Sequence, residues 1–276
     1  MRPLVSVIIP TYNSARTLEL SLISLQNQTY KNIEIIIVDN FSTDTTREIA
    51  KKYTENVFEK WPERTAQKNH GIEKAKGEYL CFIDSDMELT PWVISSCIDI
   101  FEADENIGGI CIPEDSIWEG LFVSIRAFER TFYAGTGIES ARFFRKSDVV
   151  EVGGFEEDLI FFEESLLPQK IDAKLGKSGR YRISDMIHHH EWDISLWKWL
   201  EKKYYYGKSL SQYKKKVAEL GILSIGIEQI NIINRYTLFL REEGFYKKPI
   251  LAVGVLGLKT LEFISGGIGF LFNKII

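Results

Sequence analysis

The sequence predicts an α/β fold, with a mostly parallel central sheet flanked by helices and a helical region at the C-terminal end. First, apolar, β-branched runs of strand length alternate with segments whose apolar residues recur at helical spacing. Second, polar residues directly follow three of those runs, at points where strands would end. Third, the character of the sequence changes after His190, where tryptophan, tyrosine and lysine become frequent and two long apolar segments follow.

The composition is that of an ordinary folded protein. The 276 residues can hold one large α/β domain with a helical appendage. Apolar residues make up 45% and charged residues 26%, and the net charge of -5 gives no support for a nucleic-acid partner. Three cysteines without CxxC spacing indicate neither a disulfide framework nor a zinc site. We find no signal peptide after Met1, so we expect a reducing, cytoplasmic location.

The first part of the chain alternates between predicted strands and helices. Leu4–Ile9 and Ile33–Val38 are predicted as buried strands, and the leucines between them share one face of a helix. Parallel strands joined by helices bring their carboxyl ends to one edge of the sheet, where α/β proteins bind ligands. Three such ends carry polar residues, in the segments Pro10–Asn13, Asp39–Asp44 and Asp84–Asp86.

The central stretch of the sequence is Tyr79–Ile83, a continuous apolar run that leads directly into Asp84-Ser85-Asp86. Two carboxylates one residue apart repel each other, and a divalent cation that prefers oxygen ligands, Mg²⁺ or Mn²⁺, removes that cost. The alternative is a polar turn in which Asp86 caps a helix that begins near Pro91. These residues alone leave both interpretations open.

Two common phosphate-binding motifs are missing. The sequence has no GxGxxG after the first predicted strand and no GxxxxGK[ST], so it supports neither a dinucleotide-binding fold nor a P-loop. A nucleotidyltransferase also uses paired aspartates and nucleotides, but it normally shows a glycine-rich phosphate loop after the first strand, and none is present here.

Several motifs, taken in order, resemble those of family 2 glycosyltransferases with the GT-A fold. The similarity covers roughly residues 4–210. The motifs are VSVIIPTYN (Val5–Asn13), IIVDNFSTD (Ile36–Asp44), Lys68–Ile72, FIDSD (Phe82–Asp86), Gly153–Glu157 and the pair Glu163-Glu164. The resemblance implies inverting transfer of a sugar from a UDP- or GDP-linked donor, assisted by Mn²⁺ or Mg²⁺ that stabilises the departing diphosphate.

The resemblance also implies roles for individual residues in donor and metal binding. It places Lys68 and Asn69 beside the ribose or diphosphate, and Asp84 and Ser85 near the donor. It makes Asp86 the direct metal ligand, with Asp84 as a second acidic group of the metal site. The nucleoside would be held by Pro10, Thr11, Tyr12, Asn13 and Asp39. For these residues the plainer interpretation is a strand–helix turn, a helix cap or a solvated helix face.

The pair Glu163-Glu164 stands where the family carries the aspartate that accepts a proton from the acceptor hydroxyl. We favour Glu164 as this base, because burial behind Phe161 and Phe162 would raise its pKa. The sequence departs from the family here: glutamate replaces aspartate, and Leu166 stands where a further acidic residue is common. The alternatives are two surface glutamates that begin a helix, and a non-catalytic nucleotide-sugar-binding module.

Three of the four histidines form the tract His188–His190, which follows a strand-like segment. In an extended chain alternate side chains point to opposite faces, so not all three can face one site. The family resemblance implies that one imidazole completes the metal site, and we favour His189. The alternative is stacking of the histidines on Trp192. The aromatic stretch Trp118–Gly137 is interpreted as surroundings of the donor sugar and the acceptor.

We divide the chain into a catalytic domain at residues 1–210 and a helical region at residues 211–276 that associates with a membrane or forms a dimer. Ile250–Phe272 is long enough to span a bilayer, for which ~20 residues suffice. Lys259 and Glu262 near its middle would each cost ~2.5–3.5 kcal/mol there, although their spacing allows them to pair. We therefore expect helices that lie on the membrane surface or pack in a homodimer.

The predicted function is an inverting, metal-dependent glycosyltransferase at the cytosolic face of the membrane. Its acceptor would be a glycan or a polyprenol-linked substrate, with the tryptophan-, tyrosine- and lysine-rich region after His190 near the lipid phosphate. One alternative is a polyprenyl-phosphate sugar synthase, in which a phosphate oxygen attacks and no strong base is needed. The other is the binding module that has lost catalysis.

Overall fold

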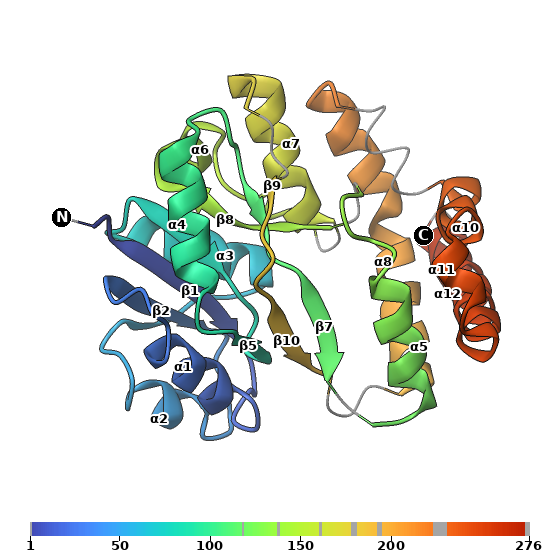
Figure 1. The fold of residues 1–276 in the computed structure, drawn as a ribbon, viewed down its shortest axis with the longest axis horizontal. Coiled ribbons are helices and arrows are strands. Elements are labelled where there is room, and N and C mark those ends of the chain that lie inside the picture. Colours follow the sequence, from blue (N-terminus) through green and yellow to red (C-terminus); the bar gives the residue numbers. More distant parts are fainter. Residues whose placement is uncertain are drawn as a thin grey trace. The chain divides into compact units, whose positions relative to one another are not determined.

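The computed structural model describes residues 2–117, 119–136, 139–159, 162–177, 181–191, 195–222 and 231–273. The chain forms two compact units (Figure 1). Unit 1 contains residues 1–114, 139–158 and 163–190, and unit 2 contains residues 115–138, 159–162 and 191–276. Each unit is described by itself below.

Unit 1 is built on a seven-stranded sheet in the order β3-β2-β1-β4-β8-β6-β9. β1 lies between β2 and β4 and is parallel to both, whereas β8 is antiparallel to β4 and β6. The strands are β1 (Val5–Thr11), β2 (Ile33–Asp39), β3 (Val57–Glu59), β4 (Tyr79–Phe82), β6 (Ile110–Cys111), β8 (Ala141–Arg145) and β9 (Tyr181–Arg182).

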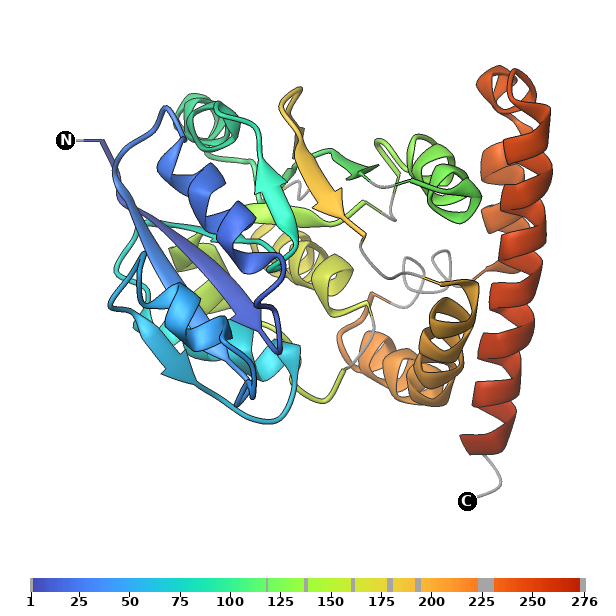
Figure 2. The same ribbon diagram turned by 90° about the horizontal axis from the view of Figure 1, so that it is seen from below.

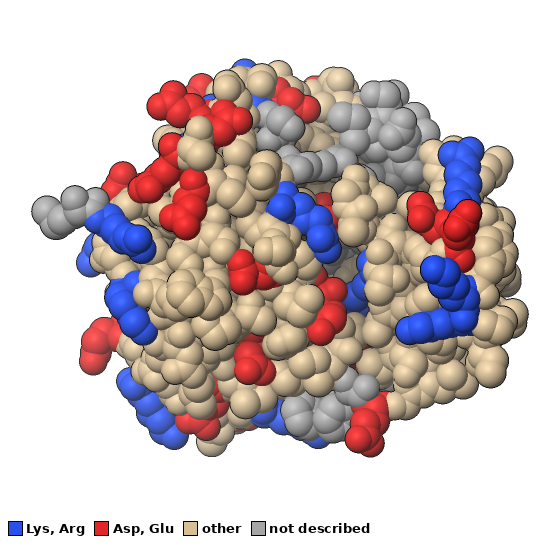
Figure 3. Space-filling model, in the orientation of Figure 1, with Lys and Arg blue, Asp and Glu red and all other residues tan. Residues whose placement is uncertain are grey.

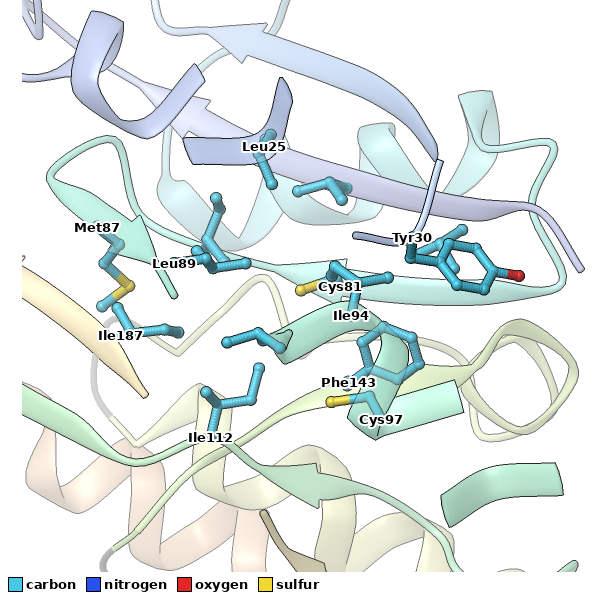
Figure 4. Packing of buried hydrophobic residues seen from close by; sticks show 14 of the residues in the cluster. Leu25, Tyr30, Cys81, Met87, Leu89, Ile94, Cys97, Ile112, Phe143 and Ile187 are labelled. Carbon is cyan, nitrogen blue, oxygen red and sulfur yellow. The ribbon is translucent and has the colours of Figure 1, made fainter. Parts of the chain in front are cut away.

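Six helices belong to unit 1. They are α1 (Leu18–Gln26), α2 (Thr46–Ala50), α3 (Arg64–Lys74), α4 (Val93–Ala103), α6 (Lys146–Glu151) and α7 (Glu163–Leu175). Successive residues of β1 point to opposite faces of the sheet, so Val7 and Ile9 join one apolar cluster and Ile8 joins the other. The first cluster packs the sheet against α1 and α4 (Figure 4), and the second packs it against α3, α6 and α7. Burial on both faces explains why these strands are continuous apolar runs.

A second, three-stranded sheet has the order β5-β10-β7. Its strands are β5 (Met87–Leu89), β7 (Glu114–Ile117) and β10 (Ile187–His190). β10 is antiparallel to β5, with His189 opposite Met87, and the backbone N–H of His190 donates to the carbonyl oxygen of Asp86 at 2.9 Å. This pairing joins the histidine tract to the turn that follows β4.

Apart from residues 115–117 of β7, the regular elements in the described part of unit 2 are helices. Its helices are α5 (Leu121–Arg130), α8 (Leu196–Glu219), α10 (Ile232–Leu240), α11 (Glu243–Tyr246) and α12 (Pro249–Asn273). The side chain of Ser195 caps α8, and that of Asn231 caps α10. Phenylalanines of α5, α10 and α11 pack on one side of α12, around Phe128, Phe239 and Phe245.

The predicted α/β architecture is confirmed, with the strands of the first half in their expected places and helices at the C-terminal end. Two features were not predicted. Residues after Asp86 form a strand, and α8 begins at Leu196, so residues 191–210 belong with the C-terminal helices. Trp118, Gly137, Phe161 and Trp192, which entered the sequence interpretation, lie outside the described residues.

All three cysteines of the chain are buried and free. Burial raises the pKa of the Cys81 thiol to about 12 and that of Cys97 well above its usual value. The expectation that no disulfide is formed is confirmed for these residues.

The close packing of α3 on β1 depends on Gly71, because a Cβ atom there would lie 2.4 Å from Cγ2 of the buried Ile8. We expect Gly71→Ala to lower the free energy of unfolding by about 1–3 kcal/mol, since overpacking outweighs the better helix propensity of alanine. Gly257→Ala in α12 is the matched control: no atom lies within 4 Å of its Cβ, so it should stabilise by up to about 1 kcal/mol. Urea unfolding of both variants measures the difference, and equal effects would contradict this account.

Candidate functional site

The carboxyl ends of β1 and β2 are tied together by a buried hydrogen-bond network around Asp39. This carboxylate has no solvent exposure; it accepts from the Thr11 hydroxyl at 2.7 Å and from the backbone N–H and hydroxyl of Ser42 at 2.7 and 2.6 Å. Such bonds replace the water that a buried carboxylate loses. Asp39 and Thr11 therefore fix the edge of the sheet, and the predicted contact of Asp39 with a nucleoside stays a prediction.

The segment that follows β1 is held against the segment that follows β2. The backbone N–H of Asn13 donates to the Ser42 hydroxyl at 2.8 Å, and its side-chain oxygen accepts from the backbone N–H of Thr43 at 2.9 Å. These bonds compensate the left-handed conformation of Asn13, which has φ of +47°. Pro10 is buried in β1, whereas the Tyr12 ring is 62% exposed and free to meet a ligand at this edge.

The turn after β4 places Asp86 beside His189. Oδ2 of Asp86 lies 3.2 Å from Nε2 of His189, and Nδ1 of the same ring lies 3.6 Å from Oε2 of Glu114. Burial raises the pKa of Asp86, but the hydrogen bond and charge of His189 lower it by more, so the carboxyl is ionised. The His189 ring thus lies beside the Asp86 carboxylate, and the His190 ring lies 2.9 Å from Glu88.

The turn is also anchored from the other side. The hydroxyls of Ser85 and Ser14 lie 2.8 Å apart, and the Ser21 hydroxyl donates to the Ser85 carbonyl oxygen at 3.1 Å. Ser85 thus connects the turn to the start of α1, and its predicted contact with the donor stays a prediction.

Asp86 and His189 fit a site for a divalent ion. Two neighbouring ligands of an octahedral ion, each about 2.1 Å from the metal, lie about 3 Å apart, and the separation seen here is 3.2 Å. Among the described residues no group of three acidic, histidine or cysteine side chains is placed to hold an ion. Mg²⁺ is commonly bound by one or two carboxylates together with substrate phosphates and water, so a two-ligand site agrees with its use.

Arg142 of β8 lies at the centre of a network of ion pairs. The side chain is 6% exposed; its Nε lies 2.6 Å from Glu114, and its terminal nitrogens lie 3.7 Å from Asp84 and 3.8 Å from Glu164. Burial lowers the pKa of Arg142, but these three carboxylates raise it by more. Asp84 therefore faces guanidinium groups, with Arg64 at 3.5 Å on its other side, while Asp86 faces the histidine.

α3 supplies two further cations from one helix face, Arg64 and Lys68, which are four residues apart. Arg64 lies 2.6 Å from Glu163, and Lys68 donates a short hydrogen bond to Glu164. Lys68 is 1% exposed, whereas Arg64 is 41% exposed and can reach a bound anion. Asn69, on the same helix, binds the backbone N–H and carbonyl of Phe155 instead, so it holds the Gly153–Glu157 segment in place.

The pKa expected for Glu164 was wrong in direction. Burial does raise it, but Lys68, Arg142 and Arg64 together lower it by more, and the pKa lies well below its usual value. Glu163 and Glu164 begin α7, and Glu163 is the more buried of the two, at 4% against 18% exposed. Both glutamates belong to the network and are not a solvated helix start.

The sequence analysis missed three members of this network: Arg64, Glu114 and Arg142. The four-residue spacing of Arg64 and Lys68 was a signal that they share a helix face. No comparable signal marked Arg142 or Glu114, because their partners lie between 22 and 75 residues away along the chain.

The ion pair between Lys68 and Glu164 should make stability depend on pH. Glu164→Gln removes the nearer partner of the buried Lys68 ammonium and leaves Glu163 3.9 Å away, so we expect a loss of about 3 kcal/mol at pH 7. Because the folded-state pKa of Glu164 is lowered, this stabilisation is complete above the unfolded pKa of about 4.3 and is lost as pH falls below it. Urea unfolding at pH 7 and pH 3 measures it, with the exposed Glu55→Gln as control. A loss that stays constant between the two pH values would contradict the ion pair.

The chain is similar in sequence to known glycosyltransferases. Residues 6–150 match the model of the family described as glycosyl transferase family 2. The chain is 26% identical over 223 residues to the GalNAc(5)-diNAcBac-PP-undecaprenol beta-1,3-glucosyltransferase of Campylobacter jejuni, covering 77% of this chain and 65% of that protein. It is 35% identical over 129 residues to the UDP-Glc:alpha-D-GlcNAc-diphosphoundecaprenol beta-1,3-glucosyltransferase WfaP of Escherichia coli, covering 44% of this chain and 51% of that protein. The chain spans less than two thirds of the length of these relatives.

Solved structures share the fold. The mannosyltransferase PcManGT from Pyrobaculum calidifontis, in complex with GDP-Man and Mn²⁺, has a TM-score of 0.67 at 17% identity, covering 99% of this chain and 88% of that one. TarS of S. aureus has a TM-score of 0.55 at 20% identity, covering 75% of this chain and 39% of that one. The predicted GT-A fold is confirmed. This chain belongs to glycosyl transferase family 2.

Proposed function

We propose that this protein is an inverting, metal-dependent glycosyltransferase that moves a sugar from a nucleoside diphosphate sugar to a lipid-linked acceptor. The proposal rests on one observation. At the carboxyl ends of β1, β2 and β4, the Asp86–His189 pair lies near the cations Arg64 and Lys68 and the carboxylate of Glu164. The family supports sugar transfer, and relatives named for diphosphoundecaprenol substrates support the lipid-linked acceptor.

The donor is proposed to lie along this edge of the sheet. Tyr12 offers an exposed ring face for stacking with the base. Arg64 is exposed enough to form charge-assisted hydrogen bonds with the diphosphate, since a guanidinium matches phosphate oxygens in pairs. Solved structures with the same fold hold GDP-Man and UDP-GlcNAc, which supports a nucleoside diphosphate sugar as donor, with either guanine or uracil as its base.

Asp86 and His189 are proposed to hold Mn²⁺ or Mg²⁺, with Asp84 close by as the second acidic group of the motif. When bound, the ion neutralises charge that develops on the departing diphosphate, so the leaving group needs no proton. Support comes from the 3.2 Å separation of the two side chains and from the Mn²⁺ bound in the mannosyltransferase with the same fold.

Glu164 is proposed as the base. The acceptor hydroxyl oxygen attacks the anomeric carbon, the bond from that carbon to the diphosphate oxygen breaks, and the hydroxyl proton passes to the Glu164 carboxylate. One displacement inverts the configuration at the anomeric carbon. The low pKa of Glu164 keeps it ionised and ready to accept, although it also makes the carboxylate a weaker base.

That weak basicity favours a second candidate, a polyprenyl-phosphate sugar synthase. In that reaction a phosphate oxygen is the nucleophile and is already deprotonated, so no base is required. The positive groups near Glu164 would then serve to hold two phosphate-bearing substrates. In either reaction a lipid acceptor would place the enzyme at the cytosolic face of the membrane, with residues 211–276 in contact with the bilayer or with a second copy.

The donor and metal requirement can be tested together with a panel of UDP-, GDP- and dTDP-sugars. We expect one donor, with Mn²⁺ present, to raise the melting temperature, since a ligand at 100 times its Kd adds about 2.7 kcal/mol. Incubation with a polyprenyl diphosphate-linked sugar should then give a product whose anomeric configuration is opposite to that of the donor, measured by NMR. Asp86→Asn should abolish the metal-dependent part of the shift. A shift without a product would leave only a non-catalytic nucleotide-sugar-binding module, and neither a shift nor a product with any donor would contradict both interpretations.

Glu164→Gln separates the two acceptor chemistries. For a sugar hydroxyl we expect kcat to fall about 10²–10⁴-fold while donor binding is retained, because the proton acceptor is lost. For a polyprenyl phosphate we expect kcat within a few fold of the unmodified enzyme. Radiolabelled transfer to each acceptor, below the melting temperature of the variant, measures this, with Glu55→Gln as control. Full activity on both acceptors would remove Glu164 from the base role.

A further inference from the structure

α12 has two faces of opposite character. Its only two charged residues, Lys259 and Glu262, are buried, and they lie on the same side as Ala252, Val255 and Leu258. Its other side is exposed and mostly apolar, with the exposed Thr260 as a polar residue near its middle; Ile250 and Val253 are 77% and 71% exposed. The members of this outer face of α12 are Ile250, Val253, Leu261, Ile264, Ile268, Leu271 and Phe272.

The charges of α12 are satisfied inside unit 2. Nζ of Lys259 lies 2.5 Å from a carboxylate oxygen of Glu129 on α5 and 2.5 Å from one of Glu262. The indole N–H of Trp199 on α8 donates to the other oxygen of Glu262 at 2.5 Å. The expected pairing of Lys259 with Glu262 is therefore confirmed, and it removes every ionisable side chain from the outer face.

Glycines fix which side of α12 turns inward. A Cβ added at Gly266 or Gly269 would point towards α8. The one at Gly269 would lie 2.0 Å from the Tyr204 carbonyl oxygen, and a Cβ added at Gly207 of α8 would lie equally close to the carbonyl oxygen of Gly266. The two helix backbones are thus in close contact along this side. Figure 2 shows α12 along the outside of unit 2. α10 borders its outer side, where the Tyr236 hydroxyl lies 2.7 Å from that of Thr260.

The charge of the neighbouring helix indicates what covers this face. α8 packs along α12 and carries seven lysines against two glutamates, although the whole chain has a net charge of -5. Lys214 lies 5.6 Å from the ring of Phe270 near one end of α12, and the exposed Lys247 and Lys248 precede its other end. An apolar strip beside basic side chains matches a surface of acyl chains and anionic headgroups. In the view of Figure 3, the surface over the C-terminal helices carries groups of basic and acidic side chains beside uncharged surface.

By length and composition α12 is the one helix, among the described residues, that could cross a bilayer. Its packing argues for a different placement. A spanning α12 would draw the lysine-rich α8 into the hydrocarbon, where each lysine costs several kcal/mol. A helix of 25 residues that lies flat presents roughly 37 Å of apolar edge to the surface and keeps α8 in the headgroup region.

We propose that the outer face of α12 is a membrane-binding surface that lies flat in the boundary between headgroups and acyl chains of a bilayer containing anionic lipid. The surface belongs to unit 2 and does not depend on the donor, the metal or the reaction. A negative result in the membrane-binding test would therefore not contradict the proposed transfer activity, and absence of transfer would not contradict membrane binding.

The test is flotation of the full chain with two kinds of vesicle. One contains phosphatidylcholine alone, and in the other about 30% of the lipid is the anionic phosphatidylglycerol. We expect flotation with the anionic vesicles and release by an alkaline carbonate wash. Ile264→Asp combined with Ile268→Asp should abolish flotation, and Lys247→Gln with Lys248→Gln should weaken binding about fivefold per lysine. Val150→Asp, an equally exposed apolar residue on α6, is the matched control and should float normally.

Ile250→Ser with Val253→Ser provides a second pair at the most exposed positions, where folding is least affected, and should also reduce flotation. Circular dichroism and the donor-induced melting shift, measured on the same samples, show that fold and donor site are intact. The proposal is overturned if wild type does not float, if the aspartate variant floats equally, or if protein resists the carbonate wash as a spanning helix would. It is also overturned if light scattering shows a dimer that the aspartate variant loses while neither protein floats.

Discussion

The arrangement of the reaction site depends on one buried guanidinium, that of Arg142. Its three carboxylate neighbours come from the turn after β4, from the start of β7 and from the start of α7, so a single side chain holds three separate segments in register. Without a cation between them, Asp84, Glu114 and Glu164 would repel one another in a region with little water. Arg142 lets these acids stand close together while Asp86 remains turned towards His189.

The ion pairs of Glu164 have opposite effects on the stability of the fold and on the basicity of this carboxylate. The ion pairs that stabilise the folded state also lower the proton affinity of the carboxylate, and a general base works best when its pKa lies near the working pH. A donor diphosphate that drew Arg64 away from Glu163 and Glu164 would weaken this influence.

The sequence predicted what depends on short-range patterns. β1, β2 and β4 are buried on both faces, so continuous apolar runs marked them, and the polar residues at their ends marked the edge of the sheet. The clustering of three histidines pointed to His189. The pairing that brings His189 to Asp86 was not predictable, because β5 and β10 are strands of three and four residues that become strands by pairing over a long distance in the chain. The same limit explains the error over Glu164: neighbouring phenylalanines suggested burial, while the cations that decide its pKa come from α3 and β8.

The buried cysteines have a practical consequence. Thiolates are the species that react with maleimides and oxidants, and burial holds the thiols of Cys81 and Cys97 protonated at neutral pH. The native chain is thus close to unreactive towards labelling reagents while it stays folded. A single cysteine introduced at an exposed position would carry a fluorophore or spin label selectively, without prior removal of the three natural ones.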